Sequence, residues 1–163
     1  MSDKKIFLRL AQRSDAWVMS AIHIAAIKAL PTTFYTRKQL LAWRNYLNKP
    51  NSKYILHSMQ AEIFFVALEN YQITGFASFI VDELIRLYVH PGYQSKGIGR
   101  ALVTHFCQQA ADQGINKVIT TASLYAEGFY CKLGFTAIKR APQQLRTGIV
   151  VPVTKMSKTL TSA

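Results

Sequence analysis

One stretch of this 163-residue chain decides its fold: Leu87-Tyr88-Val89-His90-Pro91-Gly92-Tyr93-Gln94-Ser95-Lys96-Gly97-Ile98-Gly99-Arg100. The residues from Glu83 to Val89 have the composition of a buried strand, which ends at His90-Pro91 because a proline forces the residue before it into extended geometry. Apolar residues then recur four positions apart, at Ile98, Leu102, Phe106 and Ala110. This spacing predicts a helix that begins at Gly97 or Ile98 and ends at Gly114.

The start of that helix is suited to bind an anion. The first backbone N–H groups of a helix have no acceptor within the helix, and the helix dipole adds positive potential there. Gly97 and Gly99 carry no side chain that would keep an anion away from these donors, and Lys96 and Arg100 can add charge. We therefore expect a phosphate or pyrophosphate at this loop. The alternative is that the glycines only turn the chain into the helix.

Two common nucleotide-binding loops fit this stretch poorly. A Walker-type loop needs Gly-Lys followed by Ser or Thr, which is absent here. A dinucleotide loop needs a third glycine and an acidic residue at the end of the next strand, where Ile119, Thr120 and Thr121 stand instead.

The rest of the chain alternates strand and helix patterns without a repeat or a linker, which predicts one domain over residues 1–163 of mixed α/β layers. We expect strands at residues 4–10, 62–68, 72–81, 83–89, 117–122, 135–139 and 149–156. We expect helices at residues 14–30, 36–47, 53–59, 97–114 and 124–133, with Thr36 and Gln39 in a capping-box pattern.

Composition limits the class of protein. Half of the residues are hydrophobic, yet no apolar run is long enough to span a bilayer, and residues 1–5 lead into a strand without a secretory signal. We therefore expect a cytoplasmic protein with no membrane partner. The two cysteines and four histidines show no metal-ligand spacing, so we expect no metal site. The formal net charge of +12 is compatible with a solvated basic surface or with a polyanionic partner.

Two blocks of sequence closely resemble the GNAT superfamily of acetyl-CoA-dependent N-acetyltransferases. The first is the stretch quoted above, which matches the family loop Gln/Arg-x-x-Gly-x-Gly/Ala at Gln94. The second is Ala126 followed by Phe129-Tyr130-Cys131-Lys132-Leu133-Gly134-Phe135, and Met156-Ser157-Lys158-Thr159-Leu160 echoes the last strand of many members. The resemblance covers nearly the whole chain. It implies a mixed, mostly antiparallel, twisted sheet of six to seven strands, with helices on both faces and a splayed central strand pair.

The resemblance also implies acetyl-CoA as the acyl donor. Strand residues Leu87, Tyr88 and Val89 would pair with its pantetheine arm. The pyrophosphate would be held by the loop residues Gln94, Ser95, Lys96, Gly97, Ile98, Gly99 and Arg100. Further cofactor contacts would come from Ser123, which replaces an Asn found in some relatives, and from Lys132.

The family's catalytic positions fall on two residues of this chain. Acyl transfer to an amine needs a base, because an alkyl ammonium with a pKa of about 10.4 is mostly protonated at neutral pH, and an acid for the thiolate that leaves. The resemblance implies Tyr130 as the acid and Glu83 as the base, with direct attack in a ternary complex. Helical periodicity alone also allows Tyr130 as a core residue, and Asp82-Glu83 allows a plain turn. A water relay to a carboxylate and a covalent route through Cys131 remain alternatives.

The acceptor amine is not defined by the sequence. In the family it binds near the first two helices and the late strand pair, which here selects the loop residues Phe34 and Tyr35 as candidates and a second loop at residues 141–148. A nucleic-acid-binding protein, an acyltransferase acting on aminoacyl-tRNA and a non-catalytic acyl-CoA sensor remain alternatives. A homodimer is compatible with the sequence.

Overall fold

The computed structural model of the chain describes residues 5–45 and 49–161. Its elements follow in the order β1 (Phe7–Leu10), the 3-10 turn η1 (Arg13–Asp15), α1 (Ala16–Lys28), α2 (Arg37–Asn45), α3 (Ser52–Ser58), β2 (Ile63–Glu69), β3 (Gln72–Ile80), β4 (Glu83–Val89), the 3-10 turn η2 (Pro91–Tyr93), α4 (Ile98–Asp112), β5 (Lys117–Ser123), α5 (Glu127–Lys132), β6 (Thr136–Gln144) and β7 (Val150–Thr159). The predicted ends at Lys4 and Leu47 lie outside the described residues.

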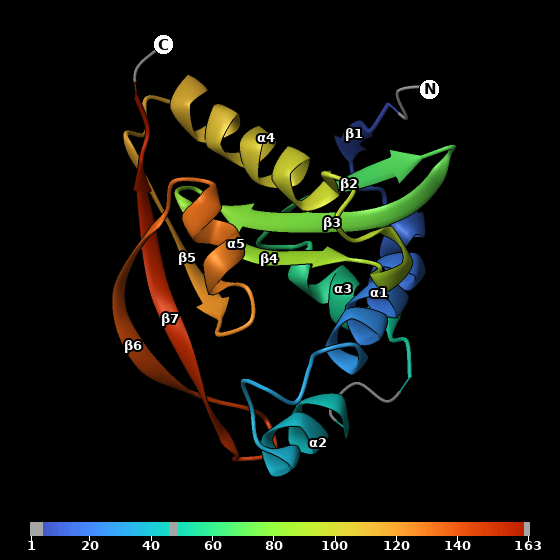
Figure 1. Cartoon of the computed structure of the whole chain (residues 1–163). Helices are drawn as coiled ribbons and strands as arrows, with labels where there is room; N and C mark the ends of the chain where they lie inside the picture. The colour runs from blue at the N-terminus through green and yellow to red at the C-terminus, as the bar shows by residue number, and fades with distance from the viewer. Residues whose placement is uncertain (1–4, 46–48, 162–163) are drawn as a thin grey trace.

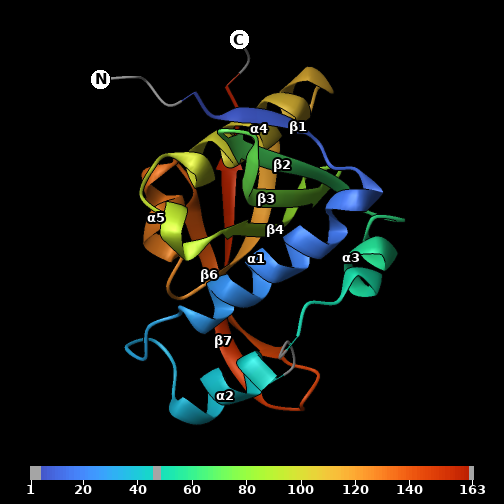
Figure 2. The same cartoon turned by 90° about the vertical axis from the view of Figure 1, so that its right-hand side faces the viewer.

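The strands form one seven-stranded sheet in the order β1-β2-β3-β4-β5-β7-β6. Every neighbouring pair is antiparallel except β4 and β5, which are parallel. Helices α4 and α5 cover one face of the sheet, and α1 and α3 cover the other (Figures 1 and 2). The predicted mixed, mostly antiparallel sheet with helices on both faces is confirmed.

The central strands β4 and β5 separate soon after they meet. They pair only at Glu83 with Ile119 and at Leu84 with Thr120. On the other side of β4, Ser78 lies opposite Arg86 and Phe79 opposite Leu84, so Ile85 is the extra residue of a β-bulge. Beyond this bulge the two strands diverge (Figure 1). We call this divergence the β4–β5 slot, and it confirms the predicted splayed pair.

Local sequence explains several boundaries. The β2–β3 hairpin turns at Asn70 and Tyr71, which both have positive φ, as a tight primed turn requires. Thr36 and Gln39 form the predicted capping box: the Gln39 N–H donates to Thr36 Oγ1, and the Thr36 N–H donates to Gln39 Oε1. Helix α5 begins at Glu127 rather than at Leu124, because Ser123 Oγ accepts from the Ala126 N–H in a turn that precedes the helix.

The predicted end of the sixth strand at residue 139 is wrong, since β6 continues to Gln144. The strand passes through Pro142, because a proline is tolerated on an edge strand and in a pair without hydrogen bonds. Here β6 is the edge of the sheet, and Pro142 lies opposite Pro152. The acceptor-side loop predicted at residues 141–148 therefore shrinks to residues 145–149.

Candidate active site

The edge of β4 that faces the slot presents free backbone groups. The His90 N–H donates to Thr74 O at 2.9 Å, so these two residues form a hydrogen-bonded pair between β4 and β3. Such pairs alternate along antiparallel strands, so the Tyr88 backbone faces β3 while the backbones of Leu87 and Val89 face the slot. The Val89 carbonyl accepts a long hydrogen bond from Gln94 Nε2, at 3.4 Å. Leu87 and Val89 can thus pair with an extended ligand, whereas Tyr88 cannot do so through its backbone.

The loop of residues 94–99, which we call the glycine loop, joins β4 to α4 through two positions with positive φ. Ser95 has φ +62° and Gly97, the N-cap of α4, has φ +84°. The first bond of the helix runs from the Ala101 N–H to Gly97 O, so the N–H groups of residues 98–100 have no acceptor within the helix. The helix start predicted at Gly97 or Ile98 is confirmed, and its free N–H groups are the kind of donor that an anion needs.

The two loop glycines have different reasons to be glycine. At Gly97 the φ of +84° would strain any residue with a Cβ. At Gly99 a Cβ would lie 3.1 Å from Phe129 Cζ, so the absence of a side chain lets α4 approach α5. The expectation that Gly99 clears room for an anion is corrected: the space beside Gly99 is occupied by the Phe129 ring.

The side chains of the loop divide between the core and the surface. Ile98 is buried in the main core, so only its backbone could meet a ligand. Lys96 is exposed, with Nζ 4.7 Å from the centre of the Tyr93 ring. Arg100 is exposed and lines an open hollow on the β1 side of α4, together with Leu8 and Thr104. Gly97 of the glycine loop lines the same hollow, so both predicted cations, Lys96 and Arg100, lie beside the loop.

Tyr130 lies on α5, buried in the core cluster that also contains Leu84 of β4 and Ala122 of β5. Its ring packs against Phe129 and Phe135. Burial raises the pKa of the Tyr130 phenol, with a smaller opposing effect from a hydrogen bond with Thr120 and a further small rise from Tyr88. Thr120 belongs to β5 and Tyr88 to β4, so the phenol lies between the two strands that border the slot. A raised pKa keeps it protonated, as a proton donor must be.

Glu83 stands at the start of β4 and lines an open pocket of about 320 Å³. The pocket is lined by Glu83, Leu84, Ile85, Thr121, Ala141, Pro142, Gln143, Val153 and Lys155. Successive side chains of a strand point to opposite faces, and Leu84 packs on the α4 and α5 face with Tyr130. Glu83 therefore lies on the opposite face from Tyr130. The two predicted catalytic side chains lie on the two sides of the sheet, close to where the slot begins.

The other predicted site residues are spread around this centre. Ser123 ends β5, half-buried, and its Oγ accepts from the Ala126 N–H at 3.2 Å. Lys132, the last residue of α5, is exposed. Phe34 is 44% exposed and lies edge-on to Tyr125.

Tyr35, in contrast, is buried. Its hydroxyl donates to Pro152 O and accepts from the Leu124 N–H at 2.7 Å. The expectation that Tyr35 contacts the acceptor is corrected, because this side chain anchors its loop to the sheet.

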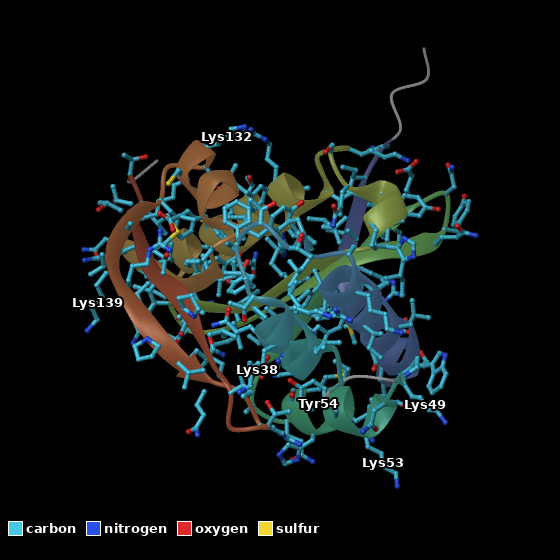
Figure 3. All side chains as sticks on the ribbon, turned by 60° about the horizontal axis from the view of Figure 1, so that its bottom comes forward. Lys38, Lys49, Lys53, Tyr54, Lys132 and Lys139 are labelled. Atoms are coloured by element: carbon cyan, nitrogen blue, oxygen red, sulfur yellow. The ribbon has the colours of Figure 1, made fainter. Side chains whose placement is uncertain are left out.

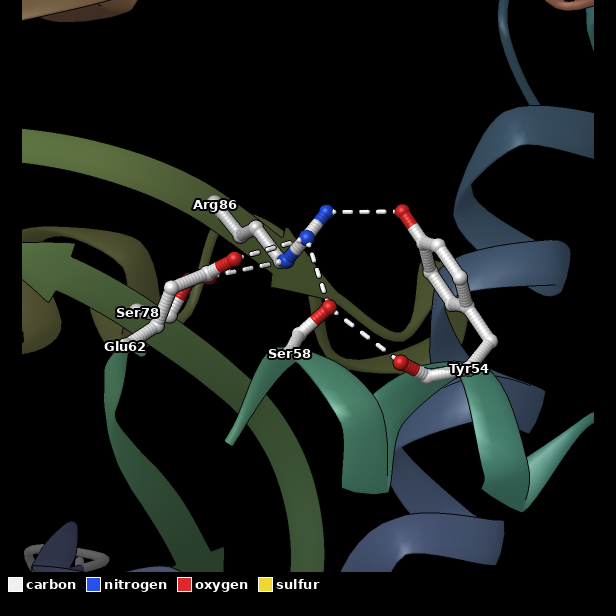
Figure 4. A network of polar contacts seen from close by, with 5 residues as sticks. All are labelled: Tyr54, Ser58, Glu62, Ser78 and Arg86. Carbon is white, nitrogen blue, oxygen red and sulfur yellow. Dashed lines mark hydrogen bonds and ion pairs between the residues drawn. The ribbon is translucent and has the colours of Figure 1, made fainter. Parts of the chain in front are cut away.

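A buried polar network supports β4 on the face opposite Tyr130 (Figure 4). Arg86, the residue after the bulge, forms an ion pair with Glu62 at 2.9 Å, and donates to Tyr54 Oη at 2.9 Å and to Ser58 Oγ at 3.0 Å. Glu62 also accepts from the Ser78 hydroxyl. Because Ser78 lies directly opposite Arg86, the network joins both strands at the bulge to α3. It thereby fixes the point at which β4 turns away from β5.

A buried histidine lies beside this network. The His23 ring of α1 packs on Tyr88, with ring centres 4.1 Å apart. Burial, and to a lesser degree the charge of Arg86, lowers the pKa of His23 to about 3. His23 is therefore neutral at physiological pH.

Sequence reasoning missed the residues that face Glu83 across the pocket. Lys155 and Thr121 lie opposite each other on β7 and β5, and both line the pocket. The last strand contained a signal for Lys155. Alternation places Val151, Val153 and Lys155 on one face of the strand, so a lysine stands where the pattern predicts another apolar residue. Pairing of the strands, which the sequence does not show, places that charge near Glu83.

No group of three or more His, Cys, Asp or Glu side chains in residues 5–45 and 49–161 is arranged to hold a metal ion. In the same part of the chain, no helix is long and apolar enough to cross a membrane.

The positive charge is distributed over the molecule. Exposed lysines come from α2 (Lys38), α3 (Lys53), α5 (Lys132) and β6 (Lys139), and Figure 3 shows them at separate places on the molecule. This distribution agrees with a solvated basic surface.

The comparisons with known proteins agree with this geometry. The family model described as acetyltransferase (GNAT) domain matches residues 31–160, so the chain belongs to the GNAT family and is an N-acetyltransferase-type acyltransferase. It is 27% identical to the uncharacterized N-acetyltransferase YafP of Escherichia coli (strain K12), over 86% of this chain and 88% of that protein. The crystal structure of a GCN5-related N-acetyltransferase from Rhodopseudomonas palustris is also similar, with a TM-score of 0.89, 27% identity, and coverage of 98% of this chain and 99% of the other. The PaiA N-acetyltransferase of Thermoplasma acidophilum, solved with coenzyme A, has a TM-score of 0.72 and 20% identity, over 95% and 99% of the chains.

Proposed function

We propose that the protein transfers the acetyl group of acetyl-CoA to a primary amine by direct attack in a ternary complex. The observation that carries the proposal is the β4–β5 slot, which leads from the free N–H groups at the start of α4 along the free backbone of Leu87 and Val89 to the bulge at Ile85. An anionic end and an extended, amide-containing arm are the chemical features of coenzyme A. The similar structure from Thermoplasma acidophilum was solved with that ligand.

The donor would lie along elements already described. The N–H groups of residues 98–100 and the Lys96 ammonium would hold the pyrophosphate. The pantetheine amides would pair with Leu87 and Val89, as an added strand does. To pair with the Val89 carbonyl, the arm displaces the long Gln94 hydrogen bond. Ser123, the last residue of β5, and Lys132, the last residue of α5, would contribute outer contacts.

The chemical step uses residues from both faces of the sheet. Glu83 takes a proton from the acceptor ammonium, and the free amine attacks the thioester carbonyl. The oxyanion is stabilised by the Val89 N–H, because the alternation described above directs the Tyr88 N–H toward β3. The C–S bond then breaks, and Tyr130 gives its phenolic proton to the departing thiolate. The attacking nitrogen loses its second proton to solvent, and solvent returns a proton to the Tyr130 phenolate. Placing the base and the acid on opposite faces lets the acceptor and the donor approach from opposite sides of the slot.

The experiment that tests this function is a broad amine panel, with release of free CoA as the readout. Acetyl transfer that depends on the amine supports the proposal. Tight acetyl-CoA binding without turnover on any amine would favour the sensor instead. Binding to RNA or DNA that falls steeply with salt, without amine acetylation, would favour the nucleic-acid alternative. Glu83→Gln should lower kcat about 10²-fold or more, as the loss of a general base does, and an unchanged kcat would exclude Glu83 as the base.

A further inference from the structure

The pocket at Glu83 has opposite charges on its two sides. Glu83 comes from β4, and Lys155 comes from β7, two strands further along the sheet. Thr121 and Val153 line the pocket between them, and Ala141 and Gln143 of β6 form its far wall. Its volume of about 320 Å³ is in the range of small-molecule sites.

Neither charge is neutralised within the described part of the chain. Within residues 5–45 and 49–161, Glu83 and Lys155 form no ion pair with each other or with another side chain, which places their charged atoms more than 4.0 Å apart. Three other carboxylates, Asp15, Glu62 and Glu127, are each paired with an arginine. A carboxylate and an ammonium that face one pocket at a distance leave room for a ligand between them.

A second lysine increases the positive potential on the β7 side. Lys139 of β6 lies directly opposite Lys155 of β7. Like charges in such a pair destabilise a sheet, by up to about 1 kcal/mol. An anion beside Lys155 would relieve this repulsion, whereas a second cationic group of a polyamine would increase it.

We propose that the acceptor is a small amino acid, a primary amine that carries a carboxylate a few atoms away, and that Lys155 binds this carboxylate. Its ammonium lies at Glu83, where it loses a proton before attack, and its carboxylate lies at Lys155, with Thr121 beside it as a hydrogen-bond donor. Ile85, Val153 and Ala141 offer apolar contacts to its side chain. This inference rests on the proposed acetyl transfer and defines the chemistry of its acceptor.

The test compares matched acceptors in the wild-type protein: an amino acid, its carboxamide, and a diamine of similar length. The carboxamide keeps the amine and the shape but has no negative charge. We expect kcat/KM for the amino acid to exceed that for the carboxamide by about tenfold or more, since charge-assisted hydrogen bonds are about twice as strong as neutral ones. Equal values for the amino acid and the carboxamide would overturn the inference.

Variants then assign the preference to one residue. Lys155→Met keeps the aliphatic stem and should lower kcat/KM for the amino acid to near the carboxamide value. Lys155→Glu should move the preference toward the diamine. Lys117→Glu is the matched control, because Lys117 is exposed on the same strand pair, four residues and about 13 Å from Thr121. It should leave the preference unchanged.

The outcomes separate the two proposals. If no amine of any kind is acetylated, the proposed function fails. If amines are acetylated but the wild-type protein shows no preference for the amino acid, or Lys155→Met keeps that preference, the function stands and the inference fails. If Lys155→Glu does not fold, the wild-type comparison and the Lys155→Met variant still test whether Lys155 binds the acceptor carboxylate.

Discussion

A Cβ atom at Gly99 would lie 3.1 Å from Cζ of Phe129, tighter than nine in ten such contacts in proteins. Gly99 is in the first turn of α4, and Phe129 is in α5 beside the buried Tyr130. The contact therefore sets the distance between the helix that would hold the pyrophosphate and the helix that carries the proposed acid.

Gly99→Ala should loosen this contact. Overpacking costs about 1–3 kcal/mol, while alanine in a helix gains up to about 1 kcal/mol over glycine. Gly128→Ala in α5 is the control, because a Cβ there meets nothing within 4 Å. We expect Gly99→Ala to be less stable than Gly128→Ala by about 1–3 kcal/mol in urea unfolding, and to have a raised KM for acetyl-CoA. Equal stability of the two variants would contradict this prediction, because it would show that the Phe129 ring moves away from the added Cβ at no energetic cost.

Gly97→Ala tests the glycine loop separately from stability. Gly97 and Gly114 both have positive φ, +84° and +77°, and neither has a close backbone neighbour. Alanine at either position should cost about 1–2 kcal/mol through backbone strain. Only Gly97→Ala should also weaken acetyl-CoA binding in a calorimetric titration, because Gly114 lies at the far end of α4. Equal binding by both variants would argue against the loop as the pyrophosphate site.

Tyr130→Phe should retain acetyl-CoA binding and lose about 10²-fold or more in kcat, the usual range for a lost acid catalyst. Since burial raises the pKa of Tyr130, the wild-type rate should not fall on the alkaline side until pH exceeds the ordinary phenol value of about 10. Phe129→Leu, a neighbouring aromatic change, serves as the control for altered packing. Undiminished turnover in Tyr130→Phe would remove the acid role.

His23 should make the protein acid-sensitive. Folding lowers the pKa of His23 from 6.5 to about 3. Between pH 3 and pH 6.5, His23 is therefore protonated in the unfolded chain and neutral in the folded chain. Above about pH 6.5 His23 is neutral in both states and the free energy of unfolding does not depend on it. As pH falls from 6.5 toward 3, protonation of the unfolded chain lowers the free energy of unfolding by up to about 1.4 kcal/mol per pH unit. His23→Phe keeps a ring against Tyr88 but cannot titrate. We expect a flatter dependence of unfolding free energy on pH between 4 and 6.5, and an unaltered slope would contradict the assignment.

The sequence predicts the parts of this structure that depend on neighbouring residues. The helix start at Gly97 and the Thr36 capping box each follow from a few adjacent residues, and the structure confirms them. Properties that depend on distant contacts were not predictable. The reason for glycine at Gly99 is a ring thirty residues away, and the extension of β6 through Pro142 depends on its place at the sheet edge.

The site shows the same division. Glu83 and Tyr130 were selected from their places in two sequence blocks, but their separation onto opposite faces required the alternation along β4 and the packing of Leu84. Tyr35 was selected as a loop residue, and only the pairing of its hydroxyl with Leu124 and Pro152 reveals an anchor. Lys155 lies at the site because the strands are ordered β4-β5-β7, and this order cannot be predicted from neighbouring residues in the sequence.

The measurement that most directly tests the central claim is a grid of initial rates at varied acetyl-CoA and amine concentrations, with the best amine of the panel. Direct attack in a ternary complex predicts double-reciprocal lines that intersect, and no acetyl group on the protein after incubation with acetyl-CoA alone. Cys131 is exposed next to Tyr130 in α5, so a covalent route has a nucleophile at hand. Parallel lines together with an acetylated Cys131 would contradict direct transfer.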